Sequence, residues 1–100
     1  MFDFIKKIFS SAPSVDYQEL LAKGAVLLDV RTSSEFKSGS VKGAINIPLD
    51  QLGNKLKMLK KNTPIITCCA SGMRSGSATR LLKSKGFDEV YNAGSFRNLL

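Results

Sequence analysis

The stretch PIITCCASGMRSGSATRLLKSKG, residues 64–86, decides the fold. It begins with Pro64, which opens a predicted strand at Ile65–Cys68. An earlier predicted strand contains the apolar run Val26-Leu27-Leu28, whose lack of alternation is typical of a strand covered on both faces. A polar loop that contains Gly72 follows the strand at Ile65–Cys68. The apolar spacing within Ser75–Lys85 then predicts a helix, which ends at the next glycine. A buried strand, a short loop and a helix form the repeating unit of a parallel α/β sheet.

The rest of the chain continues this alternation of strands and helices. Helices are predicted at Asp16–Lys23, Thr32–Lys37 and Asp50–Met58, and strands at Ala25–Val30, Gly43–Ile47 and Glu89–Asn92. Leu52, Leu56 and Leu59 are the predicted buried stripe of the third helix. We therefore expect an α/β fold, a small parallel β-sheet flanked by helices on both faces.

The 100 residues leave room for a single domain. We assign residues 1–13 to a short amphipathic helix and linker, and residues 14–100 to the domain itself. The segment MFDFIKKIF, residues 1–9, places apolar side chains on one arc of a helix and charged ones on the other. That helix either packs on its own domain or contacts a membrane surface or a partner. No apolar run approaches the roughly 20 residues of a membrane span, and no signal-peptide pattern is expected.

Charge gives a first indication of the partners. Fifteen Lys and Arg residues against eight Asp and Glu residues produce a formal charge of +7. A local basic run is formed by Lys55, Lys57, Lys60 and Lys61. This run either steers anionic donors, docks an acidic acceptor protein, or is the solvated end of a helix. No nucleic-acid partner is expected, because no aromatic residues interleave with the basic ones and no binding motif is present.

The chain has no histidine, which excludes Ser-His-Asp triads, Cys-His nucleophile pairs and the commonest metal ligand. Its two cysteines, Cys68 and Cys69, are neighbours, so they do not make a disulfide framework. Two cysteines without histidine are also a poor zinc site, and no metal site is predicted. A reduced, cytoplasmic setting fits this cysteine usage best.

The loop after the predicted strand has the features of an anion cradle with a thiol at its base. Small residues let successive N–H groups point inward, and the following helix adds its positive N-terminal end. With the charge of Arg74 these effects favour a thiolate, so the pKa of Cys69 is expected below the ordinary value of about 8.5. Such a thiolate is a nucleophile that needs no histidine. The catalytic residue is therefore predicted to be Cys69, and the substrate- or anion-binding residues to be Ala70, Ser71, Gly72, Met73, Arg74 and Ser75.

Several of these residues have two interpretations. Ser71 and Ser75 donate hydrogen bonds to a substrate anion, or Ser75 simply caps the helix. Met73 lines the mouth of the pocket or lies on the surface, and Arg74 is expected to reach toward solvent. Alternation along the strand points Cys68 away from Cys69, toward packed apolar residues where its thiol is inert, whereas Cys69 is expected to be the accessible thiol.

Asp29 and Arg31 sit at the end of the first predicted strand and are supporting candidates for the site. They either help to hold the active loop or belong to a structural ion pair, in which Arg31 meets Glu35.

Three segments in order resemble the rhodanese family of sulfurtransferases. The loop Cys69–Ser75 matches the family pattern Cys-x-x-Gly-x-Arg-Ser/Thr. The other matching segments are LDVRTSSEF with GAINIPL, residues 28–36 and 43–49, and VYNAGSF, residues 90–96. The resemblance implies the single-domain rhodanese fold and a persulfide on Cys69. It implies sulfur transfer from a small anionic donor such as thiosulfate, or from a protein persulfide, to a thiophilic acceptor, without a metal or organic cofactor.

Two other functions stay open. Some members of the family are noncatalytic interaction modules. Related phosphatases and arsenate reductases also use a cysteine, but the phosphatase loops place five residues between Cys and Arg. Only four residues separate Cys69 from Arg74, and a smaller loop suits a single sulfur atom better than a tetrahedral phosphate.

Overall fold

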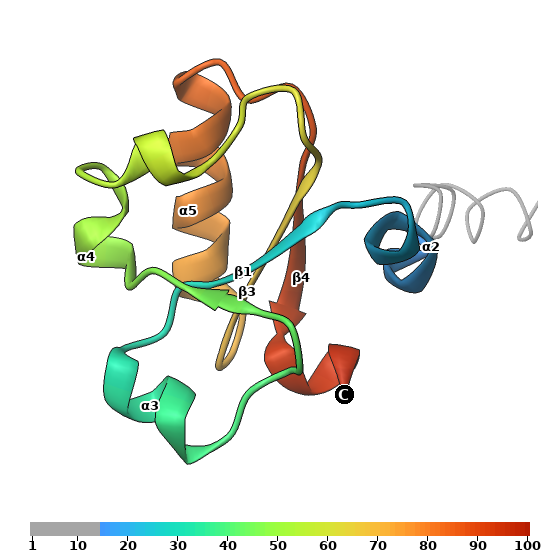
Figure 1. The fold of residues 1–100 in the computed structure, drawn as a ribbon. Helices are drawn as coiled ribbons and strands as arrows, with labels where there is room; N and C mark the ends of the chain where they lie inside the picture. The colour runs from blue at the N-terminus through green and yellow to red at the C-terminus, as the bar shows by residue number, and fades with distance from the viewer. Residues whose placement is uncertain (1–14) are drawn as a thin grey trace, which may run out of the picture.

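The computed structural model describes residues 15–100, and its centre is a four-stranded parallel sheet. The strands lie in the order β2-β1-β3-β4 (Figure 1). Their bounds are β1 Val26–Asp29, β2 Ile45–Asn46, β3 Ile65–Cys69 and β4 Val90–Ser95. Each of the four predicted strands is confirmed, and the predicted parallel α/β arrangement is too.

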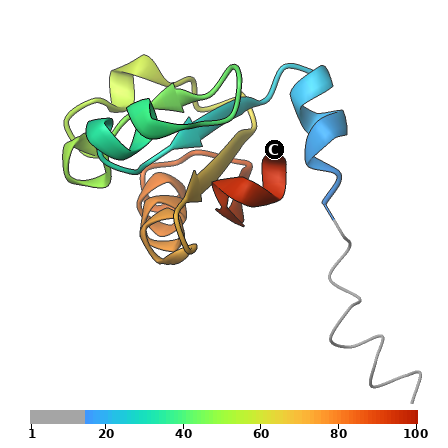
Figure 2. The same cartoon turned by 90° about the horizontal axis from the view of Figure 1, so that it is seen from below.

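The helices cover both faces of the sheet, as predicted. Their bounds are α2 Tyr17–Ala22, α3 Ser33–Ser38, α4 Leu49–Leu52, η1 Leu56–Met58, α5 Met73–Ser84 and η2 Phe96–Leu99. The α4 and α5 helices lie on one face, whereas α2 and η2 lie side by side on the other (Figures 1 and 2). Each face has its own apolar core, one built around Leu28, Ile65 and Leu82, the other around Leu27, Ile66 and Phe96.

The predicted helix Asp50–Met58 is wrong as a single element. The chain forms the four-residue helix α4 and then, after a turn, the 3-10 helix η1. Gly53 and Asn54 stand at the break, and both residue types are poor helix formers. The predicted apolar stripe nevertheless faces inward, because Leu52 and Leu59 are buried on either side of the break.

The C-terminal ends of three strands lie together at the carboxyl edge of the sheet. The register pairs Asp29 with Cys68 and Cys69 with Ser95, with a shift in register between Thr67 and Cys69. The segments that follow β1, β3 and β4 therefore begin side by side. In Figure 1 the loop before α5 and the helix α3 both lie at this lower end.

The predicted helix and linker of residues 1–13 lie outside the described residues. Between Val15 and Leu100, no helix has the length and apolar character needed to cross a bilayer.

Candidate active site

The Cys69 sulfur lies at the end of β3, inside the loop that leads to α5. The backbone N–H of Gly72 donates to this sulfur at 2.9 Å, and that of Ser75 donates at 3.4 Å. Gly72 is the N-cap of α5 with a φ of 104°, a left-handed conformation that favours glycine. A Cβ atom at this position would stand 3.3 Å from the Cα of Gly94. The predicted cradle of inward N–H groups is therefore present, and it needs glycine at its turn.

Opposing effects act on the pKa of the Cys69 thiol. Burial is the largest single effect and raises the pKa. Hydrogen bonds from Ser75, Gly72 and Ser71 favour the thiolate, and together they lower the pKa below its ordinary value. The predicted direction is confirmed.

The predicted accessibility of Cys69 is wrong in this structure. The residue is 0% exposed, because the loop closes tightly around the sulfur. The sulfur is therefore enclosed by the surrounding chain in this structure.

Arg74 does not reach freely into solvent, which corrects the prediction. Its guanidinium forms two hydrogen bonds with the Glu35 carboxylate on α3, at 2.6 and 3.0 Å. Hydrogen bonding to Arg74, and then to the backbone of Thr32, lowers the pKa of Glu35 to about 2. Thr32 and Glu35 form the capping box of α3. The Thr-x-x-Glu spacing is the local feature of the sequence that indicates the start of this helix. The partner of Arg74 is 39 residues away, so sequence reasoning missed it.

Asp29 and Arg31 form a buried ion pair at 2.7 Å. The expected partner of Arg31 is wrong, since the Glu35 carboxylate binds Arg74 and only the Glu35 backbone carbonyl accepts from Arg31, at 3.3 Å. Arg31 also donates to the carbonyl of Gly39 at 2.8 Å and stacks on Phe96 at 3.7 Å. The pair therefore ties the segment around α3 to the carboxyl edge of the sheet.

Cys68 packs in the core on the opposite face of the sheet from Cys69. Burial, and then the charge of Asp29, raise the pKa of its thiol to about 12. The predicted burial of Cys68 and the predicted rise of its pKa are both confirmed.

Ser75 is not the helix cap, because it occupies the third position of α5 and is buried. Its hydroxyl oxygen lies 3.4 Å from the Cys69 sulfur and 2.6 Å from Oδ1 of Asn92 on β4. Asn92 lies in the segment VYNAGSF, and nothing local in the sequence links it to Ser75.

The remaining loop residues differ in exposure. Met73 is 81% exposed and belongs to the surface, and Ser71 is exposed too. Ala70 is half-buried and lines a hollow of about 260 Å³ with Arg31, Glu35 and Phe96.

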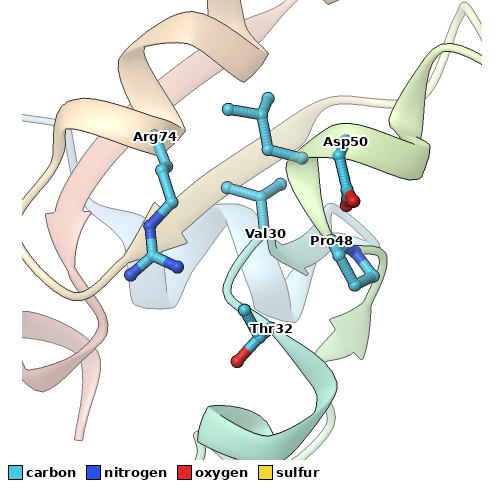
Figure 3. A pocket seen from close by; sticks show the side chains of 6 residues that line it. Val30, Thr32, Pro48, Asp50 and Arg74 are labelled. Carbon is cyan, nitrogen blue, oxygen red and sulfur yellow. The ribbon is translucent and has the colours of Figure 1, made fainter.

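A second hollow of about 300 Å³ has Arg74 in its lining. Its lining residues are Val30, Thr32, Pro48, Leu49, Asp50 and Arg74. Figure 3 shows the Arg74 and Asp50 side chains at opposite sides of this hollow, with Val30 between them. A ligand here would lie beside the catalytic loop, between a guanidinium and a carboxylate.

The basic run lies away from this site. Lys57 and Lys61 join Lys85, from the C-terminal end of α5, around a hollow of about 330 Å³ over Leu56, Leu59 and Phe87. This end of α5 is at the top of Figure 1, whereas the Cys69 loop is at the bottom. Anion steering from this edge to Cys69 therefore acts over the full length of the sheet.

Comparisons with known proteins agree with this geometry. Residues 14–98 match the family model of the rhodanese-like domain. The chain is 32% identical to the thiosulfate sulfurtransferase PspE of Escherichia coli, over 72% of this chain and 71% of that protein. It is 39% identical to YqhL of Bacillus subtilis over 73% of this chain, but it spans only 59% of the length of YqhL.

Among solved structures, the human single-domain sulfurtransferase TSTD1 superposes with a TM-score of 0.77 at 33% identity. The match covers 88% of this chain and 95% of the human protein. The two proteins are therefore of similar size and share their fold over most of both chains. On this sequence and structural evidence, the chain belongs to the family of rhodanese-like domains.

Proposed function

We propose that this domain is a rhodanese-type sulfurtransferase that moves a sulfane sulfur through a persulfide on Cys69. The observation that carries the proposal is the Cys69 sulfur held by the N–H groups of Gly72 and Ser75, at 2.9 and 3.4 Å. Those donors stabilise negative charge on sulfur, which is the charge that both the thiolate and the persulfide bear. Relatives named thiosulfate sulfurtransferases support this activity.

The reaction has two displacements. The Cys69 thiolate attacks the outer sulfur of thiosulfate, an S–S bond forms, and the old S–S bond breaks as sulfite leaves with the electron pair. An acceptor such as cyanide or a thiolate then attacks the terminal sulfur of the persulfide. The second S–S bond breaks and returns its electron pair to Cys69, so the thiolate is regenerated. No histidine base is required, because the hydrogen bonds around the Cys69 sulfur favour its thiolate.

Each loop residue has a role in this proposal. The N–H groups around Gly72 and Ser71 bind the terminal sulfur of the persulfide. The short loop from Ala70 to Met73 makes a site with room for one sulfur atom. Arg74 offers its guanidinium to the anionic end of the donor. Since Glu35 already occupies that guanidinium, the donor must compete with the carboxylate.

The donor is a small anionic sulfane compound or a protein persulfide. We place an acidic carrier protein against the basic rim formed by Lys57, Lys61 and Lys85, so that the end of the sheet with Cys69 stays open to the donor and the acceptor. A reducing compartment such as the cytoplasm suits the cycle, because both cysteines are free and Cys69 must return to a thiolate.

Intact mass spectrometry after incubation with thiosulfate tests the proposal. We expect a gain of one sulfur atom that dithiothreitol removes, absent in Cys69→Ser and retained in Cys68→Ser. If no sulfur donor loads Cys69 while the folded domain binds a protein, the noncatalytic interaction module is correct instead. Turnover of an aryl phosphate that depends on Cys69 would favour a phosphatase or arsenate reductase.

A further inference from the structure

The hydroxyl of Ser75 has one hydrogen and three groups that can accept it. Its oxygen lies 2.6 Å from Oδ1 of Asn92, 3.1 Å from the carbonyl oxygen of Gly72 and 3.4 Å from the sulfur of Cys69. A hydroxyl donates only one hydrogen bond at a time. The shortest of the three contacts places the hydrogen on the Asn92 side, away from the sulfur.

The orientation of the Asn92 amide follows from its other two contacts. The backbone N–H of Gly94 can only donate, and it lies 2.9 Å from Oδ1. The carbonyl of Gly72 can only accept, and it lies 3.3 Å from Nδ2. Both contacts require the oxygen of Asn92 to face Ser75, so the amide is an acceptor for the hydroxyl.

We propose that Asn92 is a positioning residue that holds the Ser75 hydroxyl hydrogen away from the Cys69 sulfur, and so restrains ionisation of the nucleophile. When Cys69 is a thiol, its S–H donates to Ser75 and Ser75 donates to Asn92, and every partner is satisfied. When Cys69 ionises, the sulfur becomes an acceptor that competes for the same hydrogen. The hydroxyl must then rotate about its Cβ–Oγ bond and abandon Asn92, and no proton leaves Ser75.

In this competition the Cys69 sulfur and the Asn92 amide oxygen are the two acceptors for the Ser75 hydroxyl hydrogen. It deepens the proposed function, because the terminal sulfur of a persulfide would compete for the same hydrogen, but the ionisation of Cys69 is measurable whether or not the protein transfers sulfur. A failed sulfur-loading experiment and a failed test of Asn92 are therefore distinguishable.

The charged side chains near the Cys69 sulfur come from elements other than β4. Arg74 of α5 is paired with Glu35 of α3, Arg31 is paired with Asp29 at the end of β1, and the adjacent Cys68 thiol stays protonated. The β4 strand, VYNAGS, contains no acidic or basic residue. Replacing Asn92 therefore changes the hydrogen bonding of Ser75 without removing a charge.

The pH dependence of Cys69 alkylation by iodoacetamide measures this effect, in a Cys68→Ser background that leaves one thiol. Asn92→Leu keeps the approximate shape but has no acceptor, so the pKa of Cys69 should fall by about half to one pH unit, the range of one ordinary hydrogen bond. Asn92→Asp offers a stronger acceptor and adds a negative charge, so the pKa should rise. General disruption of the loop would move both variants in the same direction.

Ser75→Ala provides the decisive comparison, because Asn92 is proposed to act through that hydroxyl. Ser75→Ala alone should raise the pKa of Cys69, and adding Asn92→Leu should then change nothing further. Asn98→Leu is a matched control, since the Asn98 side chain bonds the carbonyl of Ala93 at 3.0 Å and has no contact with Ser75. Thermal unfolding of each variant confirms that it is folded. If one variant does not fold, the comparisons among the other variants test the proposal. An unchanged or raised pKa in folded Asn92→Leu, or a full Asn92→Leu effect without the Ser75 hydroxyl, would overturn the proposal.

Discussion

Cys68 and Cys69 are adjacent in the chain, but the sheet gives their side chains different surroundings. Cys69 packs with Leu28, Ala78 and Leu82 on the α5 side, where two backbone N–H groups hold its sulfur. Cys68 packs in the other core, where no comparable donors lower its pKa and burial raises that pKa to about 12. One residue of difference along a strand therefore separates the proposed nucleophile from a core residue.

Cys68→Ser should keep sulfur loading and lose stability. A buried hydroxyl without a hydrogen-bond partner costs about 1–3 kcal/mol. Urea unfolding measures the loss, and Cys69→Ser, in which the new hydroxyl meets the N–H groups of the loop, is the matched control. Preferential alkylation of Cys68 near pH 7, or failure of Cys68→Ser to load sulfur while folded, would contradict the assignment of the two thiols.

At the scale of elements, the site is held by contacts between α3, α5 and β4. Glu35 of α3 binds Arg74 of α5, and Asn92 of β4 binds Ser75 of α5. These contacts join the segments that begin at the carboxyl edge of the sheet. The loop that surrounds Cys69 is consequently held by contacts to α3 and to β4.

The Glu35–Arg74 pair should make stability depend on acid pH. Hydrogen bonding to Arg74 is the main cause that lowers the pKa of Glu35 from 4.5 to about 2. The folded protein binds this proton less readily than the unfolded chain, so the contribution is complete above about pH 4.5 and is lost as the pH falls toward 2. Glu35→Gln should lose this part of the pH dependence.

Urea unfolding between pH 2 and 7 tests this prediction. Glu19→Gln is the matched control, because Glu19 forms only an exposed pair with Lys23 at 3.7 Å. If Glu35→Gln and the wild type lose stability in parallel over the acid range, the pair does not contribute as described.

Gly72→Ala should damage both folding and sulfur loading. Its φ of 104° disfavours any side chain, and the added Cβ would meet Gly94 at 3.3 Å. The left-handed conformation alone costs about 1–2 kcal/mol for a residue with a Cβ. Gly53→Ala is the control, since its φ is −58° and nothing lies within 4 Å of the new Cβ. We expect Gly53→Ala to unfold at an equal or higher urea concentration, and equal behaviour of the two variants would contradict this account.

At the scale of the whole molecule, a group of lysines lies at the end of the sheet opposite Cys69. The sequence has no acidic residue between Asp50 and Asp88, while that interval contains eight Lys and Arg residues. Within the described residues, only Arg74 among these eight forms an ion pair. The unpaired charge around Lys57, Lys61 and Lys85 is therefore available to a partner.

Charge reversal at this edge should have little effect on a small donor at physiological salt. The five residues of β3 span about 13 Å, which exceeds the Debye length of about 8 Å. Lys57→Glu with Lys61→Glu should keep kcat/KM for thiosulfate within about twofold at 0.15 M salt, and lower it more clearly at 0.01 M, where screening reaches about 30 Å. Stopped assays of sulfite release at both salt concentrations measure the effect. A large loss at 0.15 M would place these lysines in the path of the donor.

The sequence by itself determined the alternation of elements and the position of the proposed nucleophile. Apolar runs such as Ile65–Cys68 and the spacing within Ser75–Lys85 act locally, so they are legible without the fold. The loop around Gly72 is also local, because its turn depends on neighbouring backbone conformations. The prediction failed at Gly53, where apolar spacing alone did not show that poor helix formers would divide the helix.

Only the tertiary structure decided which distant side chains meet at the site. The partner of Arg74 lies 39 residues away and that of Ser75 lies 17 residues away. Both contacts depend on the strand order β2-β1-β3-β4, which brings the ends of β1, β3 and β4 to one edge. The burial of Cys69 has the same origin, because the neighbouring strands and α5 enclose its sulfur. Side-chain pairing across a sheet is set by register and packing between elements, and no local pattern in the chain encodes it.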